Sequence, residues 1–312
     1  MTKIKPLSSM SVPRFADVAT FFRLPVFKDL NELDYCICGV PWDGGTTNRP
    51  GARHGPREIR NSSSLVRLYH PQSLKSPYDK FNVADIGDCP VNPADLQDSL
   101  NKIEIFYSEI LKSKTIPISI GGDHLISLPI LRALAKNKPI GLFQFDSHTD
   151  TYDTYFGGFK YTHGTPFRRA IEENLIDPTK YVMVGIRGSL YHPDDLTWAK
   201  DQGVTIITID DYYSMGFNKV IEKIYKVLGD VETYLTFDID GIDSTFAPGT
   251  GTPEVGGFNV RESQMIIRAL NKINFIGADV VEVSPPFDIN NMTAHIGATI
   301  AFEILCTMTK TN

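Results

Sequence analysis

The 312-residue chain has few cysteines, no apolar run long enough to cross a bilayer, and no block of lysine and arginine. A membrane-spanning helix needs about 20 consecutive apolar residues, so the missing run argues against an integral membrane protein. The formal net charge is −6, and an acidic chain without a basic cluster is a poor partner for nucleic acid or an anionic membrane. The opening stretch, MTKIKPLSSMSVPRF, lacks the apolar core of a secretion signal. These absences predict a soluble, cytoplasmic protein.

Only four cysteines occur, and two of them form a C-x-C pair in the apolar run DYCICGV. Cys36 and Cys38 therefore point to one face of a predicted strand. A zinc site needs wider spacing and more ligands. We expect all four cysteines to be buried free thiols rather than metal ligands or disulfide partners, because free cysteine behaves as a small hydrophobic residue. The other two are Cys89 and Cys306.

Short runs rich in Ile and Val alternate with amphipathic stretches along the chain, which predicts a parallel sheet covered by helices. The predicted strands are 34–40, 114–120, 139–145, 181–186, 204–209, 233–239 and 274–283. The predicted helices are 95–114, 124–137, 217–230 and 260–273. No linker divides the chain, so we expect an N-terminal arm at 1–30 and a single domain at 31–312.

Polar segments follow four of the predicted strands. GGDH follows KTIPISI, DSHTD follows PIGLFQF, DIDGID follows TYLTF, and EVSPPFD follows ADVV. In open α/β sheets, ligands bind at the carboxyl ends of the strands. We therefore expect these four segments to converge on one pocket.

Six side chains in these segments suit metal ions, because D-x-H-x-D and D-x-D place alternate side chains on one face of an extended chain. The glycines of GGDH allow a tight turn that presents the sixth. The predicted ligands are His124, Asp146, His148, Asp150, Asp238 and Asp240. Each aspartate alone could be a turn or cap residue and each histidine an ordinary core residue. Buried aspartate is rare, however, and three such motifs at strand ends favour a metal site.

Two metal ions fit this ligand set better than one. A single ion cannot use all six ligands and still admit a substrate, whereas two ions roughly 3.5–4 Å apart can, with Asp146 and Asp238 bridging. Four buried carboxylates require cations or protons in any case. Oxygen and nitrogen ligands without cysteine suit Mn²⁺, Fe²⁺, Co²⁺ or Ni²⁺ better than a structural zinc ion.

Several longer segments resemble the ureohydrolase (arginase/agmatinase) family, and the resemblance covers nearly the whole chain. They are GVPWDGGTTNRPGARHGPREIR at 39–60, GGDH at 121–124, FDSHTDT at 145–151, HGT at 163–165, TFDIDGIDSTFAPGTGTPEVGG at 236–257 and VEVSPPFD at 281–288. The resemblance implies a three-layer α/β/α fold with a mainly parallel central sheet. It also implies a binuclear manganese centre, hydrolysis of a guanidino group to urea plus an amine or ammonia, and a homo-oligomer, either a trimer or a hexamer. Nickel is the alternative metal, since some members that act on free guanidine use it.

The resemblance also implies a role for each site residue. One ion matches the ligands His124, Asp146, Asp150 and Asp238, and the other matches Asp146, His148, Asp238 and Asp240. A hydroxide that bridges the metals is the implied nucleophile, and Asp150 holds and passes on its proton. His163 is expected to give a proton to the leaving amine, and Glu282 to pair with the guanidinium. Ser147 replaces the usual alanine and Ser244 the usual proline, and we expect little effect from either.

The segment after the D-x-H-x-D motif indicates the type of substrate. Arginases continue with residues that grip an amino-acid tail and with GN-x-HG, whereas this chain continues as TYDTYFGGFKYTHGT. The difference favours the agmatinase-like branch, which includes guanidinobutyrase, guanidinopropionase and guanidinase. We expect Tyr155, Asn48 and Trp42 to shape the tail pocket. Asp153 would favour an amine tail, and Arg49 or Asn48 a carboxylate. The predicted substrate is a guanidino acid such as guanidinobutyrate or guanidinopropionate, or free guanidine, and the alternative is agmatine.

Two other protein classes compete with this interpretation. A deacetylase-type amide hydrolase shares the general fold but uses a single zinc ion. A non-catalytic scaffold subunit would be expected to have lost ligands. The complete set of six ligands argues against both.

Overall fold

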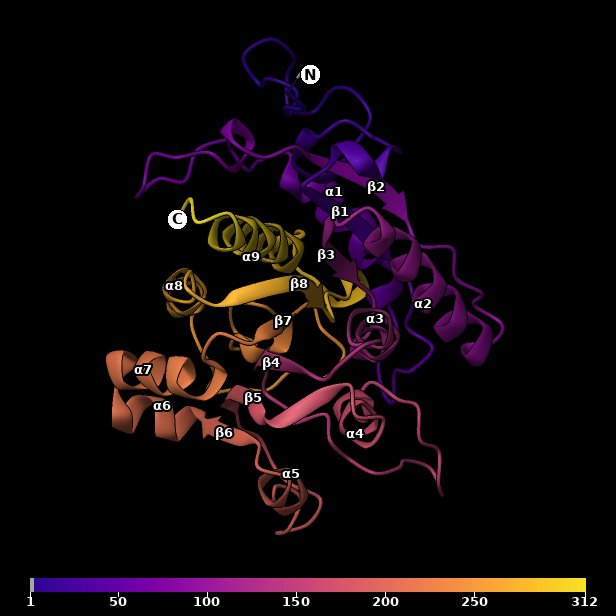
Figure 1. Cartoon of the computed structure of the whole chain (residues 1–312), viewed down its shortest axis with the longest axis vertical. Helices are drawn as coiled ribbons and strands as arrows, with labels where there is room; N and C mark the ends of the chain where they lie inside the picture. Colours follow the sequence, from indigo (N-terminus) through magenta and orange to yellow (C-terminus); the bar gives the residue numbers. More distant parts are fainter. Residues whose placement is uncertain (1–2) are drawn as a thin grey trace.

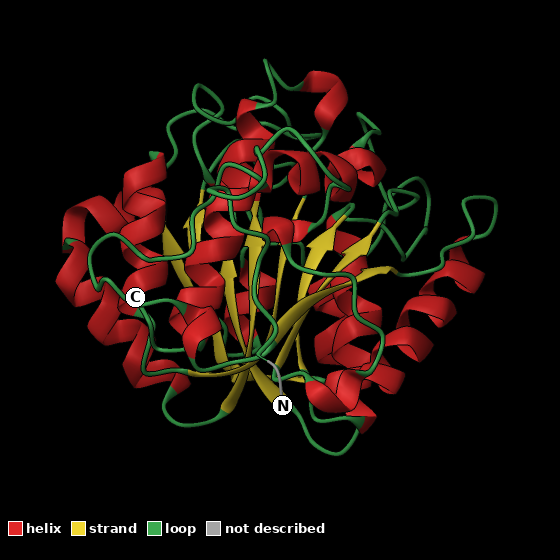
Figure 2. Ribbon diagram, turned by 90° about the horizontal axis from the view of Figure 1, so that it is seen from above, coloured by secondary structure: helices red, strands yellow, loops and turns green. Residues whose placement is uncertain are grey.

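The computed structural model describes residues 3–312 and contains one eight-stranded sheet in which all neighbouring strands are parallel (Figures 1 and 2). The strand order is β2-β1-β3-β8-β7-β4-β5-β6. The strands are β1 Tyr35–Val40, β2 Val83–Asp88, β3 Ile116–Gly121, β4 Ile140–Phe145, β5 Ile176–Ile186, β6 Thr205–Thr208, β7 Glu232–Asp238 and β8 Asn274–Val281. Every residue of β1 and β4 is buried, as expected for strands covered on both faces.

Helices cover both faces of the sheet and give three layers, which confirms the predicted α/β architecture (Figure 1). One face carries α1 Gly55–Ser63, α6 Ile209–Met215, α7 Phe217–Leu228, α8 Val260–Ala269 and α9 Met292–Met308. The other face carries α2 Leu96–Lys112, α3 Ser127–Leu134, α4 Pro166–Glu172 and α5 Thr197–Asp201. Each face buries its own hydrophobic cluster against the sheet.

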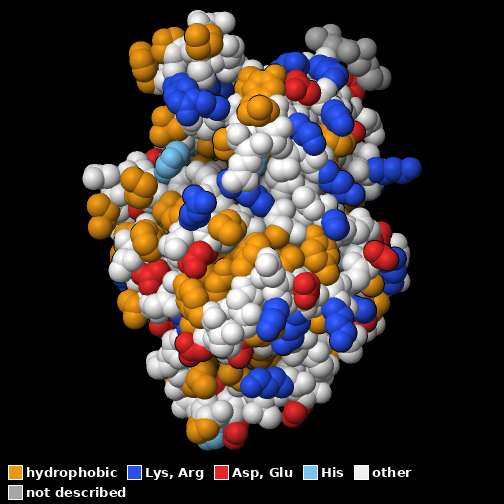
Figure 3. Space-filling model, turned by 90° about the vertical axis from the view of Figure 1, so that its left-hand side faces the viewer, with side chains coloured by type: hydrophobic (Ala, Val, Ile, Leu, Met, Phe, Trp, Pro, Cys, Tyr) orange, Lys and Arg blue, Asp and Glu red, His pale blue; other side chains and the backbone are white. Residues whose placement is uncertain are grey.

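Local sequence sets the ends of the amphipathic helices. The side chain of Asp95 caps α2, and Asn259 and Glu262 form a reciprocal capping box at the start of α8. On the outer surface of α6, α7 and α8, hydrophobic side chains are interspersed with lysine and arginine (Figure 3). Tyr213 of α6 and Met265 of α8 are among the exposed ones. Within residues 3–312, no helix is long and apolar enough to span a membrane.

The expected N-terminal arm packs against the body of the protein. Phe21 and Phe22 are buried in a hydrophobic cluster, and the ring of Phe22 lies 6.0 Å from that of Phe302 in α9. Val26 forms an isolated parallel bridge with Asp85, so the arm lines the outer edge of β2. All four cysteines are free and buried, as expected.

Strand β2 was missing from the sequence-based prediction, which had seven strands. Its sequence, VADIGD, is interrupted by Asp85 and Gly87. Asp85 is buried because the guanidinium of Arg60 pairs with it, with Nε 2.9 Å from Oδ2. A tertiary ion pair therefore allows a charged residue inside this strand, which the local apolar pattern does not reveal.

Candidate metal centre

The carboxyl ends of β3, β4, β7 and β8 meet at one edge of the sheet, as predicted. The strand register places the ends of β4, β7 and β8 at the same height in the sheet, because Phe145 pairs with Phe237 and Asp238 pairs with Val281. Asp146 and Asp238 thus leave neighbouring strands at the same height. Gly122, after β3, allows the chain to approach the carbonyl of Trp42, since an added Cβ would lie only 1.6 Å from that oxygen. The GGDH turn brings His124 into the same space.

One group of side chains surrounds the imidazole of His124, which is completely buried. Its Nδ1 lies 3.2 Å from Oδ2 of Asp146, 2.9 Å from Oδ2 of Asp150 and 3.1 Å from Oδ2 of Asp238. Nδ1 makes no hydrogen bond. A buried nitrogen without a hydrogen-bond partner and with three carboxylate oxygens around it fits a divalent cation, and these four residues form a candidate ligand group.

The other ring nitrogen of His124, Nε2, carries a proton. Nε2 lies 2.7 Å from the hydroxyl of Thr236, and that hydroxyl donates to Oδ1 of Asp279 at 2.6 Å. The hydroxyl must therefore accept the proton of Nε2, which leaves Nδ1 as the nitrogen that could bind a cation. Asp279 also accepts hydrogen bonds from Ser127 and Tyr234. Sequence reasoning missed this chain of contacts.

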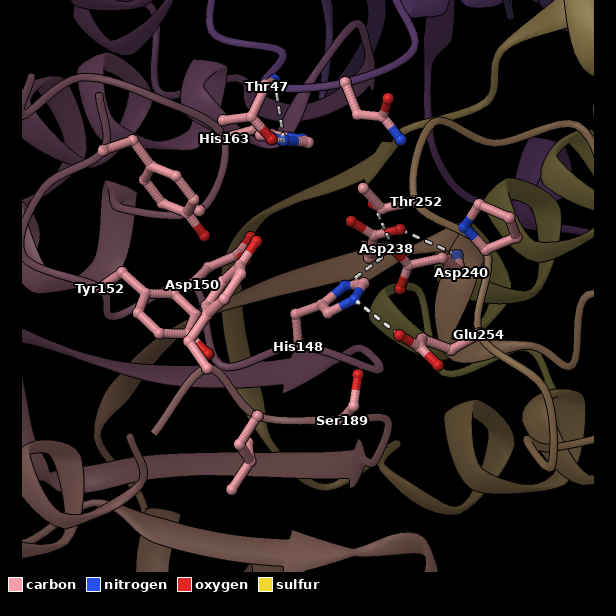
Figure 4. A pocket seen from close by; sticks show the side chains of 16 residues that line it. Thr47, His148, Asp150, Tyr152, His163, Ser189, Asp238, Asp240, Thr252 and Glu254 are labelled. Atoms are coloured by element: carbon pink, nitrogen blue, oxygen red, sulfur yellow. Dashed lines mark hydrogen bonds and ion pairs between the residues drawn. The ribbon is translucent and has the colours of Figure 1, made fainter. Parts of the chain in front are cut away.

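A second group contains Asp146, His148 and Asp240. Nδ1 of His148 lies 3.1 Å from Oδ2 of Asp240 (Figure 4). It lies 3.8 Å from Oδ1 of Asp146. Nε2 of the same ring lies 3.8 Å from Oε1 of Glu254, a carboxylate that sequence reasoning left out although it stands in the TPEVGG segment. Asp146 thus presents one oxygen to each group, as a bridging ligand would.

Asp238 joins only the first of the two groups in this structure. Its Oδ2 faces His124, while its Oδ1 accepts the backbone N–H of Asp240 at 2.8 Å. The expected bridging role of Asp238 therefore stays a prediction.

Electrostatics in this cluster favour a cation. Burial, together with Asp150 and Asp240, raises the pKa of Asp146 to about 7. Burial and the carboxylates of Asp240 and Asp146 raise the pKa of Asp238 well above its usual value. Burial also opposes ionisation of Asp240, but His148 and two hydrogen bonds from Ser147 outweigh it and lower the pKa. Carboxylates this close cannot all ionise without nearby positive charge, which two divalent ions would supply.

Two of the predicted site residues have left-handed backbone conformations. Asp150 has a φ of 52° and Glu282 a φ of 64°. Such conformations are rare outside glycine and cost about 1–3 kcal/mol each, and they cluster at functional sites. Glu282 directly follows β8, and Asp150 lies in the segment that follows β4.

His163 and Glu282 lie beside the first ligand group. Oε1 of Glu282 is 2.9 Å from Nδ1 of His163 and accepts the backbone N–H of His124 at 2.9 Å. Oε2 of Glu282 is buried and has no hydrogen-bond partner. Burial opposes protonation of His163, but Glu282 outweighs it and raises the pKa of the imidazole to about 9.

A cavity of about 310 Å³ opens over the two groups. None of its lining residues is lysine or arginine (Figure 4). The lining residues outside the ligand groups include Asn48, Tyr152, Tyr155, Ser189, Thr252 and Glu254. A cationic head group therefore suits this cavity, and neutral donors surround the remaining space.

The structure places the residues expected at the substrate tail in different surroundings. Asn48 and Tyr155 line the cavity, whereas Trp42 is buried and does not. Arg49 donates to the backbone carbonyls of Thr250 and Gly251, and its guanidinium lies over the ring of Phe287. Asp153 pairs with Arg169. Arg49 and Asp153 are therefore held by contacts within the protein.

The fold and the site define a class of protein, a parallel α/β protein with a candidate two-metal centre at its strand ends. The model of the arginase family matches residues 33–307, so the chain belongs to this family of enzymes.

Individual relatives agree with this assignment. The chain is similar to guanidinopropionase from Pseudomonas aeruginosa, with 52% identity over 98% of this chain and 96% of the relative. It is 42% identical to mitochondrial agmatinase from Gallus gallus, over 97% of this chain and 89% of the relative. Among solved structures, proclavaminate amidino hydrolase from Streptomyces clavuligerus matches with a TM-score of 0.91 and 37% identity, over 96% of this chain and 100% of the other.

Proposed function

We propose that this protein hydrolyses the guanidino group of a small molecule to urea and an amine or ammonia. The observation that carries the proposal is the pair of ligand groups that share Asp146, beside a buried carboxylate oxygen of Glu282 that has no partner. The names of the two relatives, guanidinopropionase and agmatinase, support the same reaction class.

His124, Asp146, His148, Asp150, Asp238 and Asp240 would hold the metal ions. When bound, divalent ions lower the pKa of water, from 15.7 to about 7 in the best case, and so provide a nucleophile at neutral pH. Mn²⁺ is the proposed ion and Ni²⁺ the alternative, because carboxylate and imidazole ligands suit both.

Glu282 is proposed to bind the guanidinium. Its Oε2 is buried and free, so the planar N–H groups of the substrate would give this oxygen the hydrogen bond that it lacks. Its Oε1 is held by two donors and cannot swing away. The carboxylate therefore fixes the orientation of the head group.

His163 and Asp150 are proposed to handle protons. The contact with Glu282 favours a protonated His163, whereas the backbone N–H of Thr47 points at Nε2 from 3.1 Å and favours a bare nitrogen there. Because these two contacts favour different protonation states, the imidazole can both hold a proton and deliver it to a leaving amine. Asp150 lines the same cavity and can accept a proton from the attacking water.

The proposed substrate is a guanidino acid such as guanidinopropionate or guanidinobutyrate, or free guanidine. Since no lysine or arginine lines the cavity, a carboxylate tail would bind to neutral donors such as Asn48, Ser189 and the tyrosine hydroxyls. Agmatine is the second candidate, because Glu254 at the cavity wall would favour a cationic tail.

The protein is further proposed to work in the cytoplasm as a homo-oligomer, either a trimer or a hexamer. Large exposed hydrophobic side chains support contacts between copies of the chain, among them Phe15, Val18 and Leu74.

The test is to load the protein separately with Mn²⁺ and Ni²⁺ and to measure urea release from a panel of compounds. The panel contains guanidine, guanidinoacetate, guanidinopropionate, guanidinobutyrate, agmatine and arginine. We expect urea from one guanidino acid or from guanidine far above the rest. Two bound ions with no urea from any compound would overturn the proposal.

A further inference from the structure

Ser147 lies between two residues of the second ligand group and is completely buried. Its hydroxyl donates to Oδ1 of Asp240 at 2.6 Å, and its backbone N–H donates to the same oxygen at 3.2 Å. The hydroxyl oxygen also lies 3.1 Å from Nδ1 of His148. Its backbone carbonyl accepts the N–H of Arg187 at 2.9 Å, which fixes the turn. The residue is thus held on both sides.

The two oxygens of Asp240 consequently have different environments. A carboxylate oxygen offers about two lone-pair sites, and both sites of Oδ1 are occupied by Ser147. Oδ2 instead lies 3.1 Å from Nδ1 of His148, with one long contact of 3.3 Å to the hydroxyl of Thr252. Only Oδ2 is therefore available to an ion in the second group.

We propose that Ser147 limits Asp240 to a single coordinating oxygen and thereby keeps one position of the second ion open. An alanine at 147 would leave only the backbone N–H on Oδ1, so that oxygen could turn a lone pair towards the ion. The inference rests on the proposed two-metal centre and deepens it. In this view Ser147 is a positioning residue that lowers the affinity of the second site in exchange for an open position.

Other contacts hold Asp240 in place without the hydroxyl. Its backbone N–H donates to Asp238, and its carbonyl accepts a hydrogen bond from Arg187 at 2.8 Å. Removing the hydroxyl therefore changes the number of available oxygens more than the position of the carboxylate. The Ser147→Ala variant should therefore bind the second ion more tightly rather than more weakly.

The experiment measures metal affinity in the absence of substrate, by competition with a chelator, for Ser147→Ala and for the matched control Ser119→Ala. Ser119 is an equally buried serine on β3, where its hydroxyl accepts from Tyr107 rather than contacting a ligand. Losing an ordinary supporting partner of a metal ligand weakens metal binding by about 10–100-fold, so tighter binding would set Ser147 apart from such a partner. We expect Ser147→Ala to bind the second Mn²⁺ about tenfold more tightly, with the first ion and the Ser119→Ala variant unchanged. Unchanged or weaker binding of the second ion would overturn the inference.

A crystal structure of the unaltered, Mn²⁺-loaded protein gives a second readout that does not depend on the folding of any variant. We expect one bond from Asp240, through Oδ2, to the second ion. Two bonds from Asp240 would overturn the inference while leaving the proposed function intact. Fewer than two bound ions would instead remove the basis of the proposed function itself.

Discussion

Nδ1 of His163 and Oε1 of Glu282 lie 2.9 Å apart, and that oxygen also accepts the backbone N–H of His124. One carboxylate oxygen thus joins a histidine at the cavity to the turn that presents a predicted metal ligand. The other oxygen is left for a ligand.

Replacing Glu282 with glutamine should weaken substrate binding while the metal ions stay bound. A hydrogen bond to a charged group contributes about 1.5–3 kcal/mol, so kcat/KM should fall by about ten- to a hundredfold with KM raised. Steady-state kinetics and metal analysis of the purified variant provide the check. An unchanged KM would show that Glu282 does not bind the head group.

His163→Ala should lower turnover and leave the metal content near two ions per subunit. General acid or base catalysis contributes about 10²–10⁴-fold, which sets the expected loss in kcat. The measurement pairs urea release with metal stoichiometry. A variant that loses its metal ions would make His163 a structural residue.

Asp279→Asn should weaken the first metal ion more than the second. The carboxylate accepts the Thr236 hydroxyl, which in turn fixes the ring of His124, and loss of such partners costs about 10–100-fold in affinity. Competition with a chelator measures the affinity of each ion separately. Equal weakening of both would mean that the change disturbs the whole sheet edge.

Arg187→Lys should lower the free energy of unfolding by about 1–3 kcal/mol, because one ammonium cannot replace a guanidinium that binds several carbonyls. The guanidinium of Arg187 donates to the carbonyls of Asp240, Gly241, Ile242, Glu254 and Val255. Denaturant unfolding measures the loss. Arg261→Lys is the control: this arginine of α8 is exposed, and within residues 3–312 its side chain makes no hydrogen bond or ion pair, so its replacement should change stability by less than about 0.5 kcal/mol. Equal effects of the two changes would contradict the prediction.

Removing the metal ions should lower the melting temperature. Without cations, Asp146, Asp150 and Asp238 remain within reach of one buried imidazole, and their mutual repulsion disfavours the folded state. Thermal unfolding with and without a chelator tests this. An identical melting temperature would mean that the cluster holds no ion under those conditions.

The convergence of GGDH, DSHTD and DIDGID could be predicted because apolar strands and the polar residues at their ends are local patterns. Thr236 and Asp279 could not, because the neighbouring strands β7 and β8 bring them together with a histidine that follows β3. Their importance arises from strand order, which local periodicity does not contain.

Trp42 and Ser147 also have surroundings that the local sequence does not predict. Trp42 was expected at the substrate pocket, but Gly122 lets the chain fold closely over its backbone, and the side chain is buried. Ser147 was expected to have little effect because it is not itself a ligand. Its contact with Asp240 depends on the pairing of β4 with β7, which places the two turns side by side.

The strand order also has a consequence for how the chain is made. β8 is the last strand to be synthesised, yet it lies between β3 and β7 near the middle of the sheet. A nascent chain that ends before residue 274 can pair β2, β1 and β3, and separately β7, β4, β5 and β6, but it cannot join the two halves. Long-range pairing of this kind is slow, and the exposed strand edges of the two halves invite association with other chains. The sheet can therefore close only after β8 has left the ribosome.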